Sequence, residues 1–467
     1  MTALSIPPLG RLRSLGTRTR LRVGFAILVV LSAAIVASAA SGGLSTASKE
    51  AVPAAPPTEN HTVVTESGRV GTITAYAPDG DVIYYNNSRT KYFDVDPVEG
   101  DPLTVEYTAT ETIHTKGPTC TSPPCALNVI ERADLETGEV EVVYERYDRK
   151  ELAAEWHDST RINESHVVVA DMIADQVFIV NTETGIVEWL WDAQADFPLE
   201  SGHAYPRDWT HLNDVEYIEE GEHEGRIVAS LRNQDRVVFL DPETGLVEDW
   251  TLGIEDDYDI QYEQHNPDYI PESRGGPAIV VADSENGRVQ EFQREDGEWV
   301  RTWQWADDRM QWPRDADRLP NGNTLITDTH GNRVLEVDPS GEIVWQVESM
   351  LPYDVERLET GAESTSGHSA AELGLESRTP ADADADREAG GVGFRPLEFF
   401  GGVLESVLPY RIYNALIFVA PVWIGKAEAA AIAVGLLSGV TWTALELGWR
   451  LRDSSLTVRS PVYRDRE

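Results

Sequence analysis

The chain has 467 residues, of which 80 are acidic and 38 basic, so that its net charge is −42. This balance argues against a nucleic-acid-binding protein, because phosphates require a basic surface. Only five of the basic residues are lysine. An acidic, lysine-poor composition favours a protein that works in very high salt, where self-repulsion is screened; an ordinary acidic secreted protein is the alternative.

The N-terminal segment, residues 1–45, predicts a membrane anchor or a signal. Several arginines precede an uncharged apolar run from Val23 to about Ala40, close to the ~20 residues that span a bilayer. An Ala-Ser-Ala-Ala-Ser sequence at the end of the run is compatible with cleavage, and we favour an uncleaved anchor. In both cases the arginines stay in the cytoplasm and the following chain is exported. Residues 46–60, which are rich in Ala and Pro, predict a linker.

Residues 61–358 consist of short apolar runs separated by turn residues. A signature recurs six times: a pair such as Asp-Pro or Asn-Thr, an acidic residue, a glycine and then an alternating apolar run. From the second copy onward, its marker glycines fall at positions 138, 185, 245, 297 and 341. A period of ~40–50 residues with several strands in each unit predicts an all-β fold, a six-bladed β-propeller. The first strand of each blade lines the central channel, so residues at the strand entrances meet at one mouth.

The C-terminal part of the chain predicts a tether and a second membrane segment. Residues 359–394 are rich in Glu, Ser, Ala and Gly and predict an acidic disordered linker. Residues 395–425 are apolar with interspersed charges and predict an amphipathic helix at the membrane interface. Residues 426–450 predict a transmembrane helix, and the basic tail, residues 451–467, should lie in the cytoplasm. With two spans the propeller lies outside the cell membrane.

The two cysteines, Cys120 and Cys125, bracket the sequence Thr-Ser-Pro-Pro. In an exported domain this spacing predicts a small local disulfide. A metal pair is the weaker reading, because two thiols without His or Cys partners make an incomplete zinc site.

Three histidines occupy equivalent positions in three consecutive units: His157, His211 and His265. The corresponding position in the next unit is Arg314. A single histidine at a strand entrance is usually structural or exposed, but three at one blade position should meet at one end of the channel. Arg232 also departs from the repeat. The matching turns of other units carry Met172, Ser284 and Thr329.

This combination of side chains suits nucleophilic transfer of an anionic group. A neutral imidazole would attack, a protonated one would donate to the leaving oxygen, and the Arg232 fork with an asparagine would neutralise the oxygens of the group. Two other readings stay open. One is a divalent metal, bound by the three histidines for hydrolysis. The other is a channel mouth that binds a ligand or protein partner without catalysis. For Arg232, the alternative is a surface arginine in an acidic protein.

Several stretches within residues 127–347 resemble the arylsulfate sulfotransferases. These six-bladed propeller enzymes move a sulfuryl group from a phenolic sulfate ester to another phenol without a nucleotide donor. The stretches are Trp156-His157-Asp158, Asp208-Trp209-Thr210-His211-Leu212-Asn213, Ser230-Leu231-Arg232-Asn233-Gln234, Gln264-His265 and Trp312-Pro313-Arg314-Asp315-Ala316.

The resemblance implies a role for each site residue. His265 would be the nucleophile that becomes transiently sulfated, while His211, Asn213 and Arg232 would bind the sulfuryl oxygens. His211 is also the expected proton donor, His157 would complete the site, and Arg314 would contact the substrate. The expected partners are an aryl sulfate donor and a phenolic acceptor, with no cofactor and no metal. The terminal membrane segments, the short N-terminal region and the acidity depart from the family pattern.

Overall fold

The computed structural model describes residues 16–43, 49–68, 71–149, 154–361, 366–380, 410–419, 424 and 426–453. The chain divides into two compact units. One is residues 47–392, and the other combines residues 1–46 with residues 393–467.

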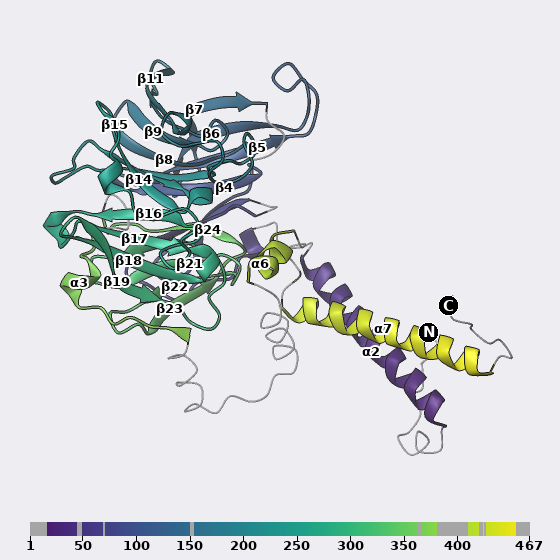
Figure 1. The fold of residues 1–467 in the computed structure, drawn as a ribbon. Coiled ribbons are helices and arrows are strands. Elements are labelled where there is room, and N and C mark those ends of the chain that lie inside the picture. The colour runs from purple at the N-terminus through teal and green to yellow at the C-terminus, as the bar shows by residue number, and fades with distance from the viewer. Residues whose placement is uncertain are drawn as a thin grey trace, which may run out of the picture. The chain divides into compact units, whose positions relative to one another are not determined.

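The first unit contains the predicted six-bladed β-propeller, whose strands lie between Thr62 and Arg357 and in which every blade is a four-stranded antiparallel sheet (Figure 1). Blade 1 contains β24 (Pro352–Arg357), β1 (Thr62–Glu66), β2 (Thr72–Tyr76) and β3 (Val82–Asn86). Blade 2 contains β4 (Lys91–Val98), β5 (Asp101–Ile113), β6 (Cys125–Asp134) and β7 (Val140–Asp148). Blade 3 contains β8 (Trp156–Asn163), β9 (His166–Asp171), β10 (Gln176–Asn181) and β11 (Ile186–Asp192).

The other three blades follow in chain order. Blade 4 contains β12 (Leu212–Tyr217), β13 (Ile227–Leu231), β14 (Arg236–Asp241) and β15 (Gly245–Leu246). Blade 5 contains β16 (His265–Ile270), β17 (Ala278–Asp283), β18 (Arg288–Glu295) and β19 (Glu298–Trp305). Blade 6 contains β20 (Pro313–Arg318), β21 (Thr324–Asp328), β22 (Arg333–Val337) and β23 (Ile343–Glu348). Short 3₁₀ helices are η1 (Lys49–Ala51), η2 (Ala193–Ala195), η3 (Arg232–Gln234), η4 (Glu248–Trp250), η5 (Glu272–Arg274) and η6 (Ser284–Asn286).

The core lies between neighbouring blades, which explains why the middle strands are apolar on both faces. All six residues of β17 are buried. Ile279 and Val281 belong to a cluster with Phe239 of blade 4, whereas Val280 packs in a cluster with Ile326 of blade 6. Because successive side chains of a strand point to opposite faces, one continuous apolar run serves two interfaces.

The first and last strands close the ring within blade 1. β24 pairs with β1 in antiparallel register, for example Thr62 with Arg357. The Arg357 Nη1 donates a 2.6 Å hydrogen bond to the Thr62 hydroxyl oxygen. β24 is the innermost strand of this blade, so blade 1 is built from both ends of the propeller sequence.

Each of the six innermost strands contains a β-bulge near its beginning. A bulge inserts an extra residue opposite its partner strand and re-aims the side chains around it. Consecutive residues can then face the channel, which regular alternation would forbid. The register shifts lie between Tyr92 and Val95, Trp156 and Asp158, Leu212 and Asp214, His265 and Asp268, and Pro313 and Asp315, and in blade 1 between the pairs Val64–Val355 and Glu66–Pro352.

Residues 366–380 lie in the segment for which we expected an unstructured tether, but they pack against the propeller. They include the short helix α3 (Ala370–Leu373). The Ala370 N–H donates to the buried Glu291 carboxylate at 2.7 Å, and Arg378 forms a β-bridge with Trp305. Residues 381–394 lie outside the described part of the chain. Blade 2 carries the predicted disulfide, Cys120–Cys125.

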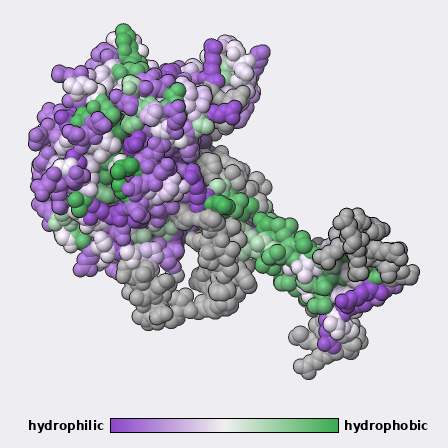
Figure 2. All heavy atoms as spheres, viewed as in Figure 1, coloured by the Kyte–Doolittle hydropathy of each residue, from purple (hydrophilic) through white to green (hydrophobic). Residues whose placement is uncertain are grey.

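In the second unit, α2 (Thr17–Gly43) and α7 (Lys426–Asp453) pack side by side and antiparallel. The Arg18 Nη1 lies 2.6 Å from the Asp453 carboxylate, and Arg22 pairs with Glu446. Both helices are long and apolar enough to cross a membrane, with mean hydropathy 2.5 and 1.5, and Figure 2 shows their hydrophobic surfaces. Of the expected interfacial helix, the structure describes α6 (Tyr410–Val419).

Candidate active site

The three histidines singled out by the repeat lie together at the end of the channel where the innermost strands begin. His157 is the second residue of β8, His211 directly precedes β12, and His265 opens β16. The ring centroids of His157 and His211 are 5.2 Å apart, and those of His211 and His265 are 6.5 Å apart. The imidazoles therefore form one cluster with His211 between the other two.

His265 is held in a single tautomer. Its Nδ1 lies 2.8 Å from the Ser284 hydroxyl and 3.2 Å from the Glu263 carbonyl oxygen. The Ser284 hydroxyl donates its own hydrogen to the Pro313 carbonyl oxygen at 2.6 Å, so it accepts from Nδ1. Nδ1 carries the proton, and the lone pair is on Nε2.

The Nε2 of His265 is buried and makes no hydrogen bond within the part of the chain that the structure describes. Burial, and then the nearby Arg314 and Arg232 guanidinium groups, hold the pKa of His265 well below its usual value. An unprotonated nitrogen with an uncommitted lone pair is the state that nucleophilic attack requires.

His211 is paired with a carboxylate. Its Nδ1 hydrogen-bonds the Asp208 carboxylate, so Nε2 is the nitrogen left to face a reactant. Burial would raise the pKa of Asp208, but the contacts with His211 and the attraction of Arg232 outweigh it and lower the pKa. For His211, burial and Arg232 lower the pKa despite Asp208. The side chain of His211 is 13% exposed and that of Asp208 33%, so solvent reaches the cluster on this side.

His157 lies deeper in the cluster. Its ring stacks on Phe93 of β4 at 4.4 Å between centroids and meets Tyr353 of β24 edge-on at 5.6 Å. Burial, followed by repulsion from His211 and Arg314, holds the pKa of His157 well below its usual value. This shift favours the neutral form of His157, whose buried Nδ1 has no hydrogen-bond partner among the described residues.

Arg232 opens η3 and lies beside two acidic groups. Its Nε and Nη2 both donate to the Asn233 side-chain oxygen, at 3.0 and 2.8 Å. Nη2 is 3.9 Å from Asp208 and 3.7 Å from Glu263. In blades 5 and 6 the equivalent residue, Ser284 or Thr329, donates its hydroxyl to the first carbonyl of the next inner strand. Blade 4 places a buried guanidinium at this position instead.

Asn213 and Arg314 complete the predicted set. Asn213 Nδ2 donates one hydrogen to the Gln264 carbonyl oxygen at 3.0 Å, which fixes the amide beside His265. The Arg314 guanidinium lies over the rings of Trp312 and Tyr353, at 4.6 and 4.9 Å. Burial lowers the pKa of Arg314 to about 10, so it stays charged at neutral pH.

Sequence reasoning missed four contributors: Tyr353, Phe93, Ser284 and Asp208. Tyr353 comes from β24, the strand that closes blade 1 from the C-terminal side, where the repeat is broken. Ser284 was visible as the counterpart of Arg232 in the next blade, but its bond to His265 needed the fold. Asp208 precedes His211 by three residues, a spacing that signals an orienting carboxylate only once the turn between them is known.

Beyond the histidines the channel is lined by carboxylates. They form two tiers, because the inward positions of each inner strand recur every second residue. The residues around this narrow space of about 40 Å³ are mostly acidic, and none of them is Lys or Arg. The first tier contains Asp94, Asp158, Asp214, Asn266, Asp315 and Asp354. The second tier contains Asp96, Thr160, Glu216, Asp268, Asp317 and Glu356.

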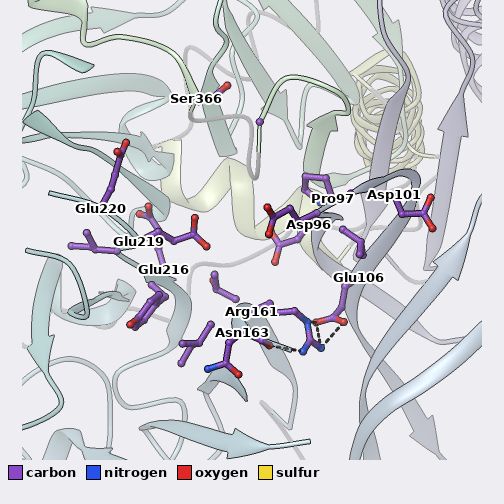
Figure 3. Close-up of a pocket in the computed structure, with 18 of the residues that line it drawn as sticks. Asp96, Pro97, Asp101, Glu106, Arg161, Asn163, Glu216, Glu219, Glu220 and Ser366 are labelled. Atoms are coloured by element: carbon purple, nitrogen blue, oxygen red, sulfur yellow. Dashed lines mark hydrogen bonds and ion pairs between the residues drawn. The ribbon is translucent and has the colours of Figure 1, made fainter. Parts of the chain in front are cut away.

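At the opposite end the channel widens into a cavity of about 990 Å³. It lies where the inner strands end, and it shares Asp96, Thr160 and Glu216 with the narrow part of the channel. Figure 3 shows Asp96, Glu216 and Glu219 around this cavity, with Arg161 bonded to Glu106 at its side. The wide cavity therefore opens onto the second carboxylate tier, not onto the histidines.

The geometry also bears on the alternative that the three histidines bind a divalent metal. In the described part of the chain, one group of at least three metal-ligating side chains has its ligand atoms all within 4.8 Å of one another. That group is Asp268, Asp315 and Asp317, and it contains no histidine. The Nδ1 atoms of His211 and His265 are engaged with Asp208 and Ser284. Among the described residues the three histidines do not bring their nitrogens into one such group, which does not favour a three-histidine metal centre.

Comparison with known proteins connects this site to one family. Residues 151–311, which include all three histidines and Arg232, match the family model of the arylsulfotransferases (ASST). No curated protein matches the chain at a significant level. The match supports an enzyme of sulfuryl transfer.

Solved structures with a similar fold include a protein of unknown function from Bacteroides caccae, with 11% identity, TM-score 0.44, and coverage of 65% of this chain and 100% of that one. The periplasmic gluconolactonase PpgL of Pseudomonas aeruginosa has 11% identity and TM-score 0.41, with 65% and 99% covered. A virginiamycin B lyase from Staphylococcus aureus has 9% identity and TM-score 0.37, with 62% and 86% covered. These likenesses carry no argument about chemistry.

Proposed function

We propose that this protein is a nucleotide-independent sulfotransferase that moves a sulfuryl group from an aryl sulfate ester to a phenolic acceptor through a sulfated His265. The observation that carries the proposal is the uncommitted Nε2 of His265, buried next to His211, within a region that matches the arylsulfotransferases. Tautomer, burial and neighbouring cations all favour the neutral nucleophile.

In the first half-reaction, His265 Nε2 attacks the sulfur of the donor. The N–S bond forms while the bond between sulfur and the phenolic oxygen breaks, and the electron pair leaves with that oxygen. The leaving oxygen takes a proton from Nε2 of protonated His211, whose Nδ1–H stays on Asp208. Binding of an anionic sulfate raises the pKa of His211 and so favours its protonated form.

In the second half-reaction, His211 acts as the base. The acceptor phenol gives its proton to His211 Nε2 and its oxygen attacks the sulfur. The N–S bond breaks, the product is a new aryl sulfate, and His265 returns to its starting state. Arg232, with the second hydrogen of the Asn213 amide, neutralises the sulfuryl oxygens in both steps. Arg314 and the Trp312 and Tyr353 rings would hold the aromatic part of the substrate.

The decisive experiment incubates the full-length chain with a nitrophenyl sulfate and a phenol in molar salt. We expect nitrophenol release that depends on the acceptor, and mass spectrometry of the acid-sensitive adduct after donor alone should place a sulfuryl group on His265. His265→Ala should abolish both signals. His114→Ala, which removes an exposed histidine of blade 2, is the matched control and should leave both unchanged.

Two results would contradict the proposal. Nitrophenol release without an acceptor that disappears on chelation would identify a metal-dependent hydrolase. No turnover with any aryl sulfate, together with normal folding of His265→Ala, would leave a binding propeller as the better description.

We also propose that the chain is anchored in the cell membrane by α2 and α7, with the propeller on the extracytoplasmic side. Antiparallel pairing puts the N-terminal end of α2 beside the C-terminal end of α7, as the Arg18–Asp453 pair shows. Arginines accumulate at that shared end, which the positive-inside rule assigns to the cytoplasm. Both connections to the propeller then leave from the other end.

Protease treatment of intact cells tests this topology. The propeller should be digested from outside, whereas an epitope placed after Glu467 should stay protected until the membrane is permeabilised. A protected propeller, or an epitope that is cleaved in intact cells, would contradict the arrangement.

A further inference from the structure

The two carboxylate tiers in the channel are not needed by the sulfuryl chemistry, and they concentrate negative charge in a confined space. Ten carboxylates line it, from the innermost strands of all six blades. Buried charges of one sign persist only when something compensates them. The question is which of these groups are compensated by the protein itself.

Some of the carboxylates join neighbouring blades. Asp354 accepts from the Val95 N–H at 2.7 Å, Asp94 from the Ser159 N–H at 3.4 Å, and Glu216 from the Tyr269 N–H at 2.7 Å. Each bond connects the inner strand of one blade to a neighbouring blade. A structural role therefore accounts for these three groups.

The groups of blades 5 and 6 are different. Asp268, Asp315 and Asp317 bring one carboxylate oxygen each to within 4.8 Å of one another. The Oδ2 atom of Asp268 is buried and has no hydrogen-bond partner within the described residues, whereas Asp315 shares a hydrogen bond with the Asp354 carboxyl group. Mutual repulsion at this separation, in a space without Lys or Arg, disfavours three ionised carboxylates.

An independent observation comes from Asn266, a neutral residue lining the same space. The residue is 7% exposed, and its side-chain Oδ1 makes no hydrogen bond in the described part of the chain. A buried amide oxygen without a donor is uncommon. It lies two residues from Asp268 on β16, at the bulge that turns this strand toward the channel.

We propose that Asp268, Asp315, Asp317 and the Asn266 side-chain oxygen bind a divalent cation, Ca²⁺, in the centre of the propeller channel. All the ligands are oxygens, which suits hard cations. Three ligand oxygens within 4.8 Å of one another can share one Ca²⁺, whose bonds of about 2.3–2.6 Å allow ligand–ligand distances up to about 5.2 Å. The octahedron of Mg²⁺, with bonds of about 2.0–2.1 Å, is smaller.

The channel offers room for the ion and a path to it. Its narrow part, about 40 Å³, accommodates an ion with little more than one water. The wide cavity opens onto the second tier through Asp96 and Glu216 (Figure 3). Glu99, Glu219 and Glu220 lie on its wall. Three arginines also line the cavity, but its acidic residues outnumber them. A mainly acidic cleft concentrates cations, so cations enter from the end opposite the histidines.

The test measures ion binding without any sulfate ester, so its outcome is independent of the proposed function. The full-length chain is treated with a chelator, dialysed at constant ionic strength in potassium chloride, and titrated with Ca²⁺ by calorimetry. We expect about one Ca²⁺ per chain and a Ca²⁺-dependent rise in Tm. Mg²⁺ at the same concentration should bind at least about tenfold more weakly, as its smaller octahedron requires.

The double variant Asp268→Asn, Asp317→Asn distinguishes a Ca²⁺-binding site from a carboxylate cluster that is only structural. We expect it to bind Ca²⁺ at least about 100-fold more weakly, because two charged ligands are lost. In chelator its Tm should equal or exceed that of the wild type, since repulsion is relieved. Glu183→Gln, on an exposed turn of blade 3, is the control and should behave as the wild type does.

Three results would overturn the proposal. They are no saturable Ca²⁺ binding by the wild type, unchanged binding by the double variant, or a Tm that the double substitution lowers equally with and without Ca²⁺. Tighter binding of Mg²⁺ would overturn the choice of Ca²⁺.

Discussion

The tautomer of His265 depends on one hydroxyl group, that of Ser284. Because this hydroxyl is committed to the Pro313 carbonyl as a donor, it can only accept from Nδ1. The Glu263 carbonyl oxygen is a second acceptor for the same hydrogen, at 3.2 Å. Two acceptors on the opposite side of the ring thus leave Nε2 unprotonated, and in the proposed mechanism Ser284 is a positioning residue.

Ser284→Ala should therefore weaken the preference for the reactive tautomer without removing it. We expect kcat to fall by about tenfold, the lower end of the effect of losing a partner that orients a functional histidine, while KM for the donor changes little. Ser284→Thr, which keeps the hydroxyl, should restore activity. Steady-state kinetics with a nitrophenyl sulfate measure both parameters, and an effect on KM alone would contradict the positioning role.

The pH dependence of the reaction follows from the lowered pKa values of the histidines. The pKa of His265 is below its ordinary value of 6.5, so the nucleophile stays neutral as the pH falls to 6.5 and becomes protonated only at lower pH. We expect kcat/KM for a nitrophenyl sulfate to be flat from about pH 7.5 to 6.5 and to decline below that range. A decline centred at or above pH 6.5 would contradict a neutral His265 of lowered pKa.

The proton donor gives the opposite dependence on pH. Poor phenolate leaving groups need the proton of His211, whose pKa is also lowered. Their rates should therefore drop as the pH rises, more steeply than those of the nitrophenyl ester. Equal profiles for the two donors would argue against His211 as the acid.

At the scale of single residues, the repeat predicted which side chains meet but not how they are tuned. His157 and His265 occupy matching positions of β8 and β16, as the repeat predicted. His211 was wrongly aligned with them: it directly precedes β12, and the strand register gives Asn213 as their counterpart in blade 4. The partners that set tautomer and charge come from elsewhere: Ser284 from the next turn and Tyr353 from the closing strand. Such contacts join positions far apart in sequence, and no local pattern encodes them.

At the scale of elements, the β-bulges of the inner strands could not be predicted from the sequence. Regular alternation predicts that His157 and Asp158 point to opposite faces of β8. The bulge between Trp156 and Asp158 allows both to serve the channel, and the same device recurs in every inner strand. A bulge has no strong sequence signature unless it uses glycine, so the blade pattern predicted the strands but not the carboxylate tiers that follow the histidines along the channel.

The segment around α3 is a second place where the prediction was wrong, because its composition indicated a disordered linker. Its average composition is polar and acidic, yet a few residues dock tightly. Ser369 is fully buried, caps α3 by accepting from the Glu372 N–H, and donates to the Gly275 carbonyl oxygen at 3.0 Å. Average composition does not register a few docking residues such as Ser369, so it predicted that residues 366–380 would be disordered.

Ser369→Ala should lower the free energy of unfolding. The substitution removes a helix cap and leaves the Gly275 carbonyl without that donor, which together cost about 1–2 kcal/mol. Urea denaturation at fixed salt measures the change. Thr115→Ala, an exposed position in blade 2, should change stability by less than about 0.5 kcal/mol, and equal effects of the two substitutions would contradict docking of this segment.

At the scale of the whole molecule, the net charge of −42 predicts how stability responds to salt. Raising KCl from about 0.1 M to about 1 M shortens the screening length from roughly 10 Å to 3 Å, which weakens repulsion among surface carboxylates. We expect Tm to rise over this range. Sodium chloride should act similarly, and a Tm that falls with either salt would contradict a fold limited by self-repulsion.

The fold itself was the most predictable feature. Six copies of one signature at blade-sized spacing are sufficient for a propeller, because each blade repeats the same strand and turn pattern. The repeat could not show how the ring closes, since blade 1 takes β1, β2 and β3 from the start of the propeller and β24 from its end.

This closure has a consequence for the order in which the protein matures. Tyr353 and Asp354 lie on β24, so the aromatic wall of the histidine cluster and one member of the first carboxylate tier are contributed by the last strand of the ring. Neither is in place until almost the entire propeller has been synthesised and β24 has paired with β1. A chain that is truncated or stalled before that strand carries all three histidines but no finished channel. Incomplete copies of the protein therefore lack the finished wall of the histidine cluster.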